Sequence, residues 1–290
     1  MDDEQRRTLI DTRFRHPEAV AEAARRREPL ERARWPEQLL IIAADHTARG
    51  VMGVGANQTA MGDRYELLDR LQTALSVPGV DGVLGSPDII DDLLVLGALD
   101  DKVVFGSMNR GGLPGAVFEI DDRFTGYSAR SIVDTGLDGG KMLLRINLDD
   151  PGTADTLSAC ASAIGELAAA TRVAMIEPFM NSRTDGHARN VLTTDAVIRS
   201  MAIASALGPT SAYSWLKVPV VENMSRVAEA ATLPLVLLGG ERADRPDEMF
   251  RRWGDALALP GVRGLVVGRN LLYPADDDVA AAVKTAASLL

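Results

Sequence analysis

The stretch Leu39-Leu-Ile-Ile-Ala-Ala-Asp45 introduces the pattern on which the fold is built. It is a continuous apolar run that ends in a carboxylate, and a polar, glycine-rich loop from His46 to Gly62 follows it. Continuous runs, unlike alternating ones, are typical of parallel strands that are covered on both faces. A helix is then expected to begin at Asp63, because Glu66 follows it at the spacing of a capping box. The stretch therefore predicts a strand, a loop and a helix of an α/β protein.

The same pattern of strand and helix recurs seven more times along the chain. The expected strands are 39–45, 81–85, 102–107, 141–147, 172–178, 212–218, 233–239 and 262–268. Eight strand–helix units over about 250 residues match a (β/α)8 TIM barrel. An open doubly wound sheet is the alternative. It would more often carry a glycine-rich phosphate fingerprint after the first strand, and the chain lacks one there.

Two further helices are predicted before the first strand, at Glu4–Arg15 and Pro17–Arg27. We expect them to pack outside the main domain, as a solvated arm or as an oligomer contact. The predicted domains are therefore an N-terminal helical arm at 1–37 and a catalytic (β/α)8 barrel at 38–290. A homo-oligomer is the expected assembly.

The composition argues against several classes of partner. The net charge of −10 and the pI near 4.9 disfavour nucleic acid and acidic membrane surfaces. No apolar run reaches about 18 residues, so no membrane span is expected, and the N-terminus lacks the apolar core of a signal peptide. The single cysteine, Cys160, cannot form an internal disulfide, which fits a cytoplasmic location. An anionic small-molecule substrate is compatible with the net charge, because local arginines and backbone N–H groups can bind it.

Lysine is scarce in this chain, which has four lysines and 27 arginines. One of the four, Lys217, lies within the apolar stretch Tyr213-Ser-Trp-Leu-Lys217-Val-Pro-Val-Val221. An amine can lose its proton and attack a carbonyl group, and a guanidinium cannot. Lys217 is therefore predicted to form a Schiff base. The alternative is a strand-end lysine that pairs with a neighbouring carboxylate.

Three more ionisable residues lie at strand ends or within strands. In a TIM barrel the active site lies at the C-terminal ends of the strands, and residues two apart on a strand share a face. Asp45, Glu177 and Lys217 are therefore predicted to converge. Lys141 would be a second cation that lowers the pKa of Lys217, and the two acids would transfer protons. The alternatives are structural ion pairs and, for the acids, helix capping.

The last two strands end in glycine. Gly239 and Gly240 follow the seventh strand, and Gly268 and Arg269 follow the eighth. Loops at these positions, leading to a short extra helix, form the common phosphate site of TIM barrels. The sequence therefore predicts that these four residues bind a phosphate, with simple turns as the alternative.

Two arginines near the third and fourth strands, Arg110 and Arg145, are candidates to bind a second anionic group such as a carboxylate, unless they are solvated or salt-bridged. His16, His46 and His187 show no metal-ligand spacing, which argues against a zinc-dependent aldolase. No metal and no cofactor are expected, and His46 is predicted to be a bystander.

Several short sequence motifs, spread over residues of about 38–273, are similar to those of a known superfamily. They are Ala44-Asp45-His-Thr-Ala-Arg49-Gly50, Lys141-Met-Leu-Leu, Ile176-Glu177-Pro178, Trp215-Leu-Lys217-Val-Pro219, Leu238-Gly-Gly240 and Val267-Gly-Arg269. The chain resembles the class I aldolases that include deoxyribose-phosphate aldolase and the tagatose-1,6-bisphosphate aldolases. More closely, it resembles an actinobacterial (β/α)8 branch found beside inositol-catabolism genes, with which it shares Gly106-Ser-Met-Asn-Arg110 and the N-terminal helices.

The resemblance assigns roles to eight of the residues above. It implies that Lys217 is the Schiff-base lysine, Lys141 a second active-site lysine, and Glu177 and Asp45 the acids, with phosphate loops at Gly239, Gly240, Gly268 and Arg269. The chain departs from the deoxyribose-phosphate aldolases at the seventh strand. They carry an extra lysine there, and this chain reads Leu235-Val-Leu-Leu.

The resemblance implies a metal-independent lyase that cleaves or forms a C–C bond in a phosphorylated keto sugar. The specific expectation is the cleavage of 5-dehydro-2-deoxygluconate 6-phosphate to dihydroxyacetone phosphate and malonate semialdehyde. The alternatives are an aldolase for tagatose or fructose bisphosphate, sulfofructose phosphate or deoxyribose phosphate, a non-covalent sugar-phosphate isomerase, and a non-catalytic sugar-phosphate-binding barrel.

Overall fold

The strands form a closed barrel. The computed structural model describes residues 1–109, 111–184, 187–240 and 245–290. Its strands are β1 Leu39–Ala44, β2 Gly82–Gly85, β3 Val103–Ser107, β4 Gly139–Ile146, β5 Val173–Thr184, β6 His187–Asn190, β7 Ser214–Pro219, β8 Leu235–Leu238 and β9 Val262–Val267. They are ordered β4-β3-β2-β1-β9-β8-β7-β5-β6, and an additional pairing of β4 with β5 closes the ring. All neighbours pair in parallel except β5 and β6. The predicted (β/α)8 barrel is confirmed.

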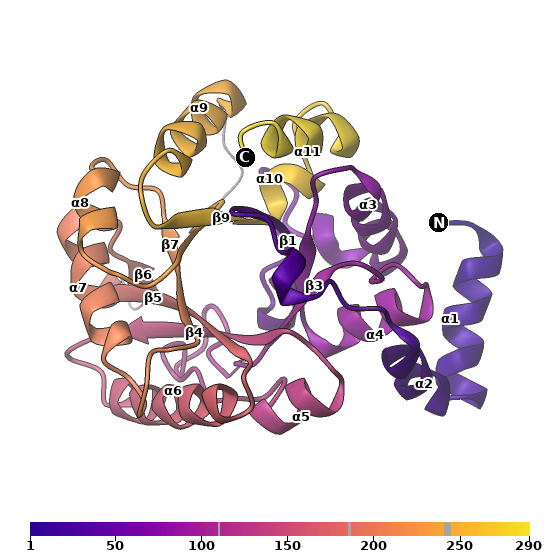
Figure 1. Ribbon diagram of the computed structural model, residues 1–290, viewed down its shortest axis with the longest axis horizontal. Coiled ribbons are helices and arrows are strands. Elements are labelled where there is room, and N and C mark those ends of the chain that lie inside the picture. Colours follow the sequence, from indigo (N-terminus) through magenta and orange to yellow (C-terminus); the bar gives the residue numbers. More distant parts are fainter. Residues whose placement is uncertain (110, 185–186, 241–244) are drawn as a thin grey trace.

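Helices surround this barrel (Figure 1). Along the described chain they are α1 Asp3–Arg15, α2 Glu18–Arg26, α3 Arg64–Ser76, α4 Pro87–Val95, α5 Ala129–Asp134, α6 Gly152–Ala169, α7 Thr194–Ser205, α8 Met224–Glu229, α9 Pro246–Leu257, α10 Arg269–Leu272 and α11 Val279–Ala287. Short 3-10 turns occur at η1 Arg32–Arg34, η2 Thr47–Arg49 and η3 Ala60–Gly62. Within the described ranges, no helix is long and apolar enough to cross a membrane.

The apolar residues of each strand divide between two cores. On β1, Leu40 and Ile42 face outward and pack in the layer between strands and helices. Leu39, Ile41 and Ala43 face inward, into a second cluster that fills the barrel. This alternation follows from the pleat of a strand. The sequence predicted that Leu39, Ile41 and Ala43 share an inward face with Asp45, and the inward position of these three residues is confirmed.

The inner cluster is closed by aromatic packing. The ring centroid of Trp215 lies 5.7 Å from that of Trp35 and 5.8 Å from that of Phe105. Edge-to-face and tilted ring pairs of this kind stabilise a core beyond the area they bury. Trp215 therefore packs inside the barrel.

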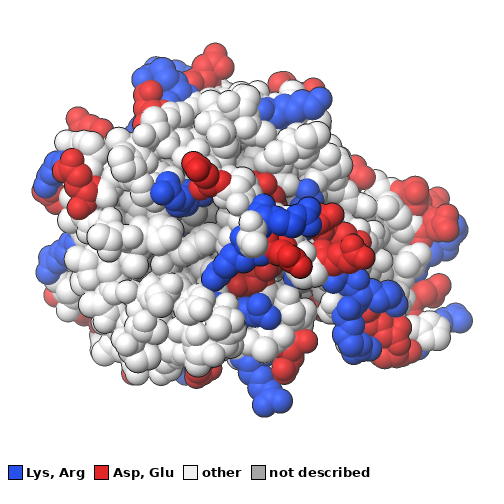
Figure 2. All heavy atoms as spheres, viewed as in Figure 1, with Lys and Arg blue, Asp and Glu red and all other residues white. Residues whose placement is uncertain are grey.

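The N-terminal helices lie to one side of the barrel, next to α4 (Figure 1). Leu9 of α1 and Ala23 of α2 are buried, and Arg13 Nη2 lies 2.5 Å from Asp92 Oδ1 of α4. Figure 2 shows acidic and basic side chains interspersed over this part of the molecule. The predicted helical extension is thus present, and the boundary at 37/38 between an arm and a barrel domain stays a prediction.

One strand differs from its predicted length. The sequence suggested that the fifth strand ends at Glu177-Pro178, but β5 continues to Thr184 and pairs with the antiparallel strand β6. Phe179 and Met180 are buried and continue the register with β4. Burial of these two side chains favours an extended chain beyond the proline. The prediction took Pro178 as the end of the strand and therefore missed this extension.

Candidate active site

A cavity of about 900 Å³ opens at the C-terminal ends of the barrel strands. Its floor and wall come from strand ends around the ring, including Ala43, Asp45, Lys141, Leu143, Glu177, Lys217, Pro219, Leu238, Gly239, Val266 and Gly268. This is the position of TIM-barrel active sites. The volume is in the range of small-molecule sites.

Four charged side chains form a buried cluster on the floor of this cavity. Lys217 Nζ lies 2.9 Å from Glu177 Oε1. Lys141 pairs with the other oxygen of Glu177, and its Nζ lies 3.2 Å from Asp45 Oδ2. Ser107 Oγ donates a hydrogen bond of 2.8 Å to the same Asp45 oxygen. The predicted convergence of Asp45, Glu177 and Lys217 is observed, with Lys141 bridging the two acids.

The strand register explains why these side chains meet. Lys141 of β4 pairs with Met175 of β5, and Met175 pairs with Trp215 of β7. Glu177 and Lys217 each follow two residues later, on the same inward face of their strands. The three side chains therefore rise from neighbouring strands onto one side of the barrel axis.

Burial and mutual attraction shift the ionisation of the central pair in a consistent way. Burial alone would raise the pKa of Glu177, but the ammonium groups of Lys141 and Lys217 outweigh it and hold that pKa at about 2. Burial lowers the pKa of Lys217 below its ordinary 10.5, and the charge of Lys141 lowers it further, against the attraction of Glu177. Lys217 therefore loses its proton more readily than an exposed lysine does, beside a carboxylate that stays ionised.

The predicted phosphate-binding residues lie together on the β8–β9 side of the cavity. Gly239 and Gly240 follow β8, while Gly268 precedes the short helix α10, which begins at Arg269. Asn270 Nδ2 donates a hydrogen bond of 2.8 Å to the Gly239 carbonyl oxygen, so the two loops are joined. Gly240 has φ +68° with open space where a Cβ would lie. The structure brings these residues together at the cavity wall, and their binding of phosphate stays a prediction.

The two other predicted arginines have different outcomes. Arg145 lines the cavity, but its Nε and Nη2 donate hydrogen bonds of 2.9 and 2.6 Å to the carboxylate of Asp122, and Nη2 also donates to the Gly112 carbonyl at 3.1 Å. The salt-bridged alternative is therefore the observed state of Arg145. Arg110 lies outside the described residues.

The sequence reasoning gave no role to two residues that line the cavity. His46, predicted to be a bystander, has a buried Nδ1 without a hydrogen-bond partner in the described structure, and burial lowers its pKa to about 4, so the ring is neutral at physiological pH. Arg49 has a buried Nε that likewise lacks a partner among the described residues. Both residues lie within the sequence motif 44–50, which is one of the motifs that the chain shares with the class I aldolases. That shared motif was the signal in the sequence that could have indicated them.

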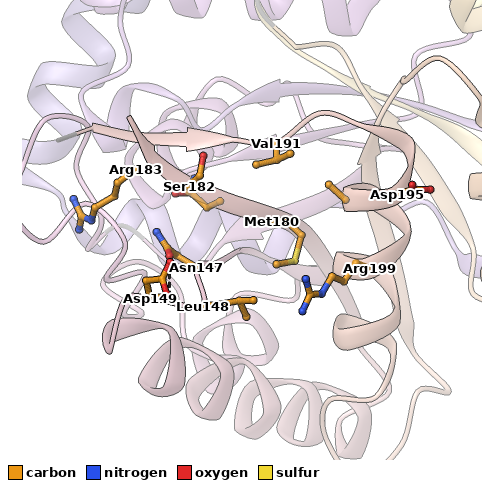
Figure 3. Close-up of a pocket in the computed structure, with 11 residues that line it drawn as sticks. Asn147, Leu148, Asp149, Met180, Ser182, Arg183, Val191, Asp195 and Arg199 are labelled. Carbon is orange, nitrogen blue, oxygen red and sulfur yellow. Dashed lines mark hydrogen bonds between the residues drawn. The ribbon is translucent and has the colours of Figure 1, made fainter. Parts of the chain in front are cut away.

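A second cavity, of about 560 Å³, lies between the end of β4, the extension of β5 and α7. Figure 3 shows Leu148, Met180 and Val191 between polar side chains such as Asn147 and Arg199. None of the described residues that line it is a lysine. The buried lysines Lys141 and Lys217 line the cavity at the barrel mouth instead.

Comparison with known proteins places the chain in a family. A family model described as Cgl0159-like matches residues 37–287. The chain belongs to the Cgl0159-like family. The crystal structure of Cgl0159 from Corynebacterium glutamicum (Brevibacterium flavum) is 57% identical in sequence, with a TM-score of 0.96 over 100% of this chain and 97% of that one. No curated protein matches the chain.

More distant structures share the fold of this Cgl0159-like protein. One is an archaeal fructose-1,6-bisphosphate aldolase with its catalytic lysine covalently bound to the carbinolamine intermediate of the substrate. It is 15% identical, with a TM-score of 0.67 over 93% of this chain and 98% of that one. The fructose-bisphosphate aldolase from Slackia heliotrinireducens is also 15% identical, with a TM-score of 0.65 over 99% and 87% of the two chains. At this identity the likeness establishes the barrel architecture.

Proposed function

We propose that the protein is a class I aldolase, a lyase that forms a Schiff base between Lys217 and the carbonyl carbon of a phosphorylated keto sugar. The observation that carries the proposal is the buried Lys217 amine, 2.9 Å from Glu177 on the floor of the barrel-mouth cavity. The shared fold with an archaeal aldolase whose catalytic lysine is bound to its carbinolamine intermediate supports it.

The first half of the reaction follows from the charge cluster. Lys217 adds as the free amine to the substrate carbonyl, and the carbinolamine oxygen takes up a proton and leaves as water. The resulting iminium accepts the electron pair of the bond between the α and β carbons when that bond breaks. The products of this step are an enamine and a free aldehyde.

Proton transfer in this scheme falls to Glu177 and Asp45. The pKa of Glu177 is low because two ammonium groups lie against it. The positive charge on the Lys217 nitrogen is lost when the amine gives up its proton, and again when the iminium becomes the neutral enamine, so at both steps the carboxylate becomes a better proton acceptor. The proton removed from the hydroxyl of the departing aldehyde then has a nearby base. Lys141 remains as the cation that keeps the neutral state of Lys217 accessible.

The substrate class follows from the glycine loops. We assign the sugar phosphate to Gly239, Gly240, Gly268 and Arg269, where backbone N–H groups and a guanidinium can approach it. Within that class our specific proposal is 5-dehydro-2-deoxygluconate 6-phosphate, cleaved to dihydroxyacetone phosphate and malonate semialdehyde in inositol catabolism. We also retain a homo-oligomer and a cytoplasmic location as predictions.

Borohydride trapping tests the mechanism. The protein is incubated with dihydroxyacetone phosphate and sodium borohydride, digested, and searched by mass spectrometry for the reduced adduct. We expect the adduct on Lys217 in the wild type and its loss in Lys217→Arg, because a guanidinium cannot form the imine.

The matched control is Lys284→Arg, which changes an exposed lysine of α11 and should leave trapping intact. An adduct on another lysine contradicts the assignment of Lys217. No adduct at all is the result that a non-covalent isomerase or a binding barrel predicts.

A further inference from the structure

We propose that Arg49 is an anion-binding residue that makes this enzyme select substrates with a second negatively charged group. This group would lie beyond the reacting carbons, away from the phosphate at the β8–β9 loops. The inference rests on the proposed function and adds the residue that recognises the second negative charge of the substrate. A carboxylate and a second phosphate share the required chemistry, and the test below separates them.

The first observation is that the Nε of Arg49 lacks a hydrogen-bond partner among the described residues. Its buried Nε has no hydrogen-bond acceptor, and its guanidinium makes no ion pair with any Asp or Glu of the described chain. Three buried cations that line the cavity are paired: Lys217 with Glu177, Lys141 with Glu177 and Asp45, and Arg145 with Asp122. Arg49 is half-buried, and its Nε is buried. Buried charges in folded proteins are normally paired, because desolvation of an unpaired one is costly. An unpaired guanidinium facing a cavity therefore indicates a partner that arrives with the ligand.

The second observation is the sign of the charge in the cavity. The described residues that line it include eight Lys or Arg and four Asp or Glu, whereas the whole chain has 31 Lys and Arg against 41 Asp and Glu. The cavity is thus positive in a protein whose net charge is −10. One phosphate on the β8–β9 loops would leave part of this excess unmatched. A substrate with two anionic groups matches it better.

The third observation places Arg49 within the cavity. The charges that act on it most are those of Arg145, Asp122, Glu177 and Asp45. Arg49 lines the barrel-mouth cavity together with Arg145, Glu177 and Asp45, so an anion bound by Arg49 would lie beside the catalytic cluster.

The local backbone holds this arginine in a defined place. The 3-10 turn η2 follows β1 directly, with the Arg49 amide donating a hydrogen bond of 3.1 Å to the His46 carbonyl. Gly50 ends the turn with φ +74°, a conformation that favours glycine. A guanidinium fixed in this way can bind a carboxylate or a phosphate through two parallel hydrogen bonds. Arg49 is thus a specificity-determining residue for the end of the substrate that departs as the aldehyde.

The test measures aldol condensation of dihydroxyacetone phosphate with three aldehydes. They are malonate semialdehyde, which carries a carboxylate, glyceraldehyde 3-phosphate, which carries a phosphate, and neutral glyceraldehyde. In Arg49→Gln we expect kcat/KM for the preferred anionic aldehyde to fall roughly 10- to 100-fold, the loss of one charge-assisted contact. We expect neutral glyceraldehyde to be unaffected and Arg49→Lys to retain part of the activity. Arg199→Gln, in the second cavity, is the matched control and should behave like the wild type.

The outcomes separate this inference from the proposed function. A loss confined to malonate semialdehyde supports a carboxylate site, and a loss confined to glyceraldehyde 3-phosphate supports a second phosphate site. Equal kcat/KM values of Arg49→Gln and wild type for all three aldehydes, or an equal loss for all three, overturn the inference. Borohydride trapping of dihydroxyacetone phosphate on Lys217 should persist in Arg49→Gln, which also shows that the variant folds. Failure of that trapping in the wild type overturns the proposed function instead.

Discussion

At the scale of residues, the distinctive feature is that two lysines share one buried carboxylate. Lys141 and Lys217 both pair with Glu177, and Asp45 holds the far side of Lys141. Under the proposed function, the two lysines have different roles. One amine can be neutral part of the time because the other stays close by as a cation.

The change Lys141→Met tests this division of tasks. Burial lowers the pKa of Lys217, and the charge of Lys141 adds to that effect. Without Lys141, the attraction of Glu177 should keep the proton on Lys217 to higher pH. The rate of trapping with dihydroxyacetone phosphate falls at low pH, where Lys217 is protonated. We expect this fall, the acid limb of the pH profile, to move to higher pH in the variant. The measurement is the rate of borohydride trapping between pH 5 and 10, with Lys284→Met as the control that leaves the limb in place. A limb that stays or moves to lower pH contradicts the role of Lys141.

The candidate site was predictable from the sequence only where a residue was unusual for its context. Lys217 is one of four lysines and lies in an apolar strand, so its presence required a reason. Asp45 and Glu177 followed from strand alternation. Arg49 is one of 27 arginines and lies in a loop, and nothing local marks it. The role that we propose for it rests on an Nε without a hydrogen-bond partner among the described residues, which only the assembled structure shows.

At the scale of elements, the end of β9 shows how closely the strands approach one another around the cavity. A Cβ placed on Gly268 would lie 2.2 Å from the carbonyl oxygen of Ala43 and 2.9 Å from Cε1 of His46. The first contact involves the backbone of β1, which cannot move without disturbing the barrel. The glycine therefore allows β9 and β1 to hold the predicted phosphate loop and Asp45 side by side.

The variant Gly268→Ala should destabilise the protein by about 1–3 kcal/mol, the usual cost of overpacking a core. It should also weaken capture of dihydroxyacetone phosphate, because the loop must shift. Gly254→Ala is the control, since a Cβ there meets only Leu289 at 3.6 Å, and alanine in a helix interior is favoured by about 1 kcal/mol. Urea unfolding should separate the two variants in opposite directions. Equal midpoints would show that β9 and β1 are free to separate.

The ends of elements were the least predictable part of the fold. Continuous apolar runs located all eight barrel strands, because burial on both faces leaves a strong signal. The signal failed at β5, where Pro178 suggested an end and the strand ran on to Thr184. The antiparallel partner β6, His187–Asn190, is polar and exposed for most of its length, so it has no apolar pattern to detect.

At the scale of the whole molecule, closure of the barrel depends on long-range contacts. The pairing of β4 with β5 and of β1 with β9 closes a ring that spans residues 39 to 267. The sequence predicted this closure only indirectly, through the count of strand–helix units. The buried cluster joins β4, β5 and β7 with the end of β1, so its ionisation is coupled to global unfolding.

Acid should therefore unfold the protein partly through Glu177. Its pKa is about 2 in the folded protein against an ordinary 4.5. A depressed acid pKa contributes stability that is fully present above pH 4.5 and is lost as the pH falls through about 2. The difference of about 2.5 pH units corresponds to about 3 kcal/mol. In Glu177→Gln no proton is taken up at this position, so the stability advantage of the wild type over this variant should shrink by about that amount.

Urea unfolding at several pH values between 6 and 2 measures this difference in unfolding free energy. The control is Glu229→Gln, an exposed position on α8, whose difference from the wild type should stay nearly constant. A pH-independent difference for Glu177→Gln would mean that the two lysines do not hold this carboxylate ionised in the folded state. The proposal that Glu177 becomes a better proton acceptor when a positive charge beside it is lost would then have no physical basis.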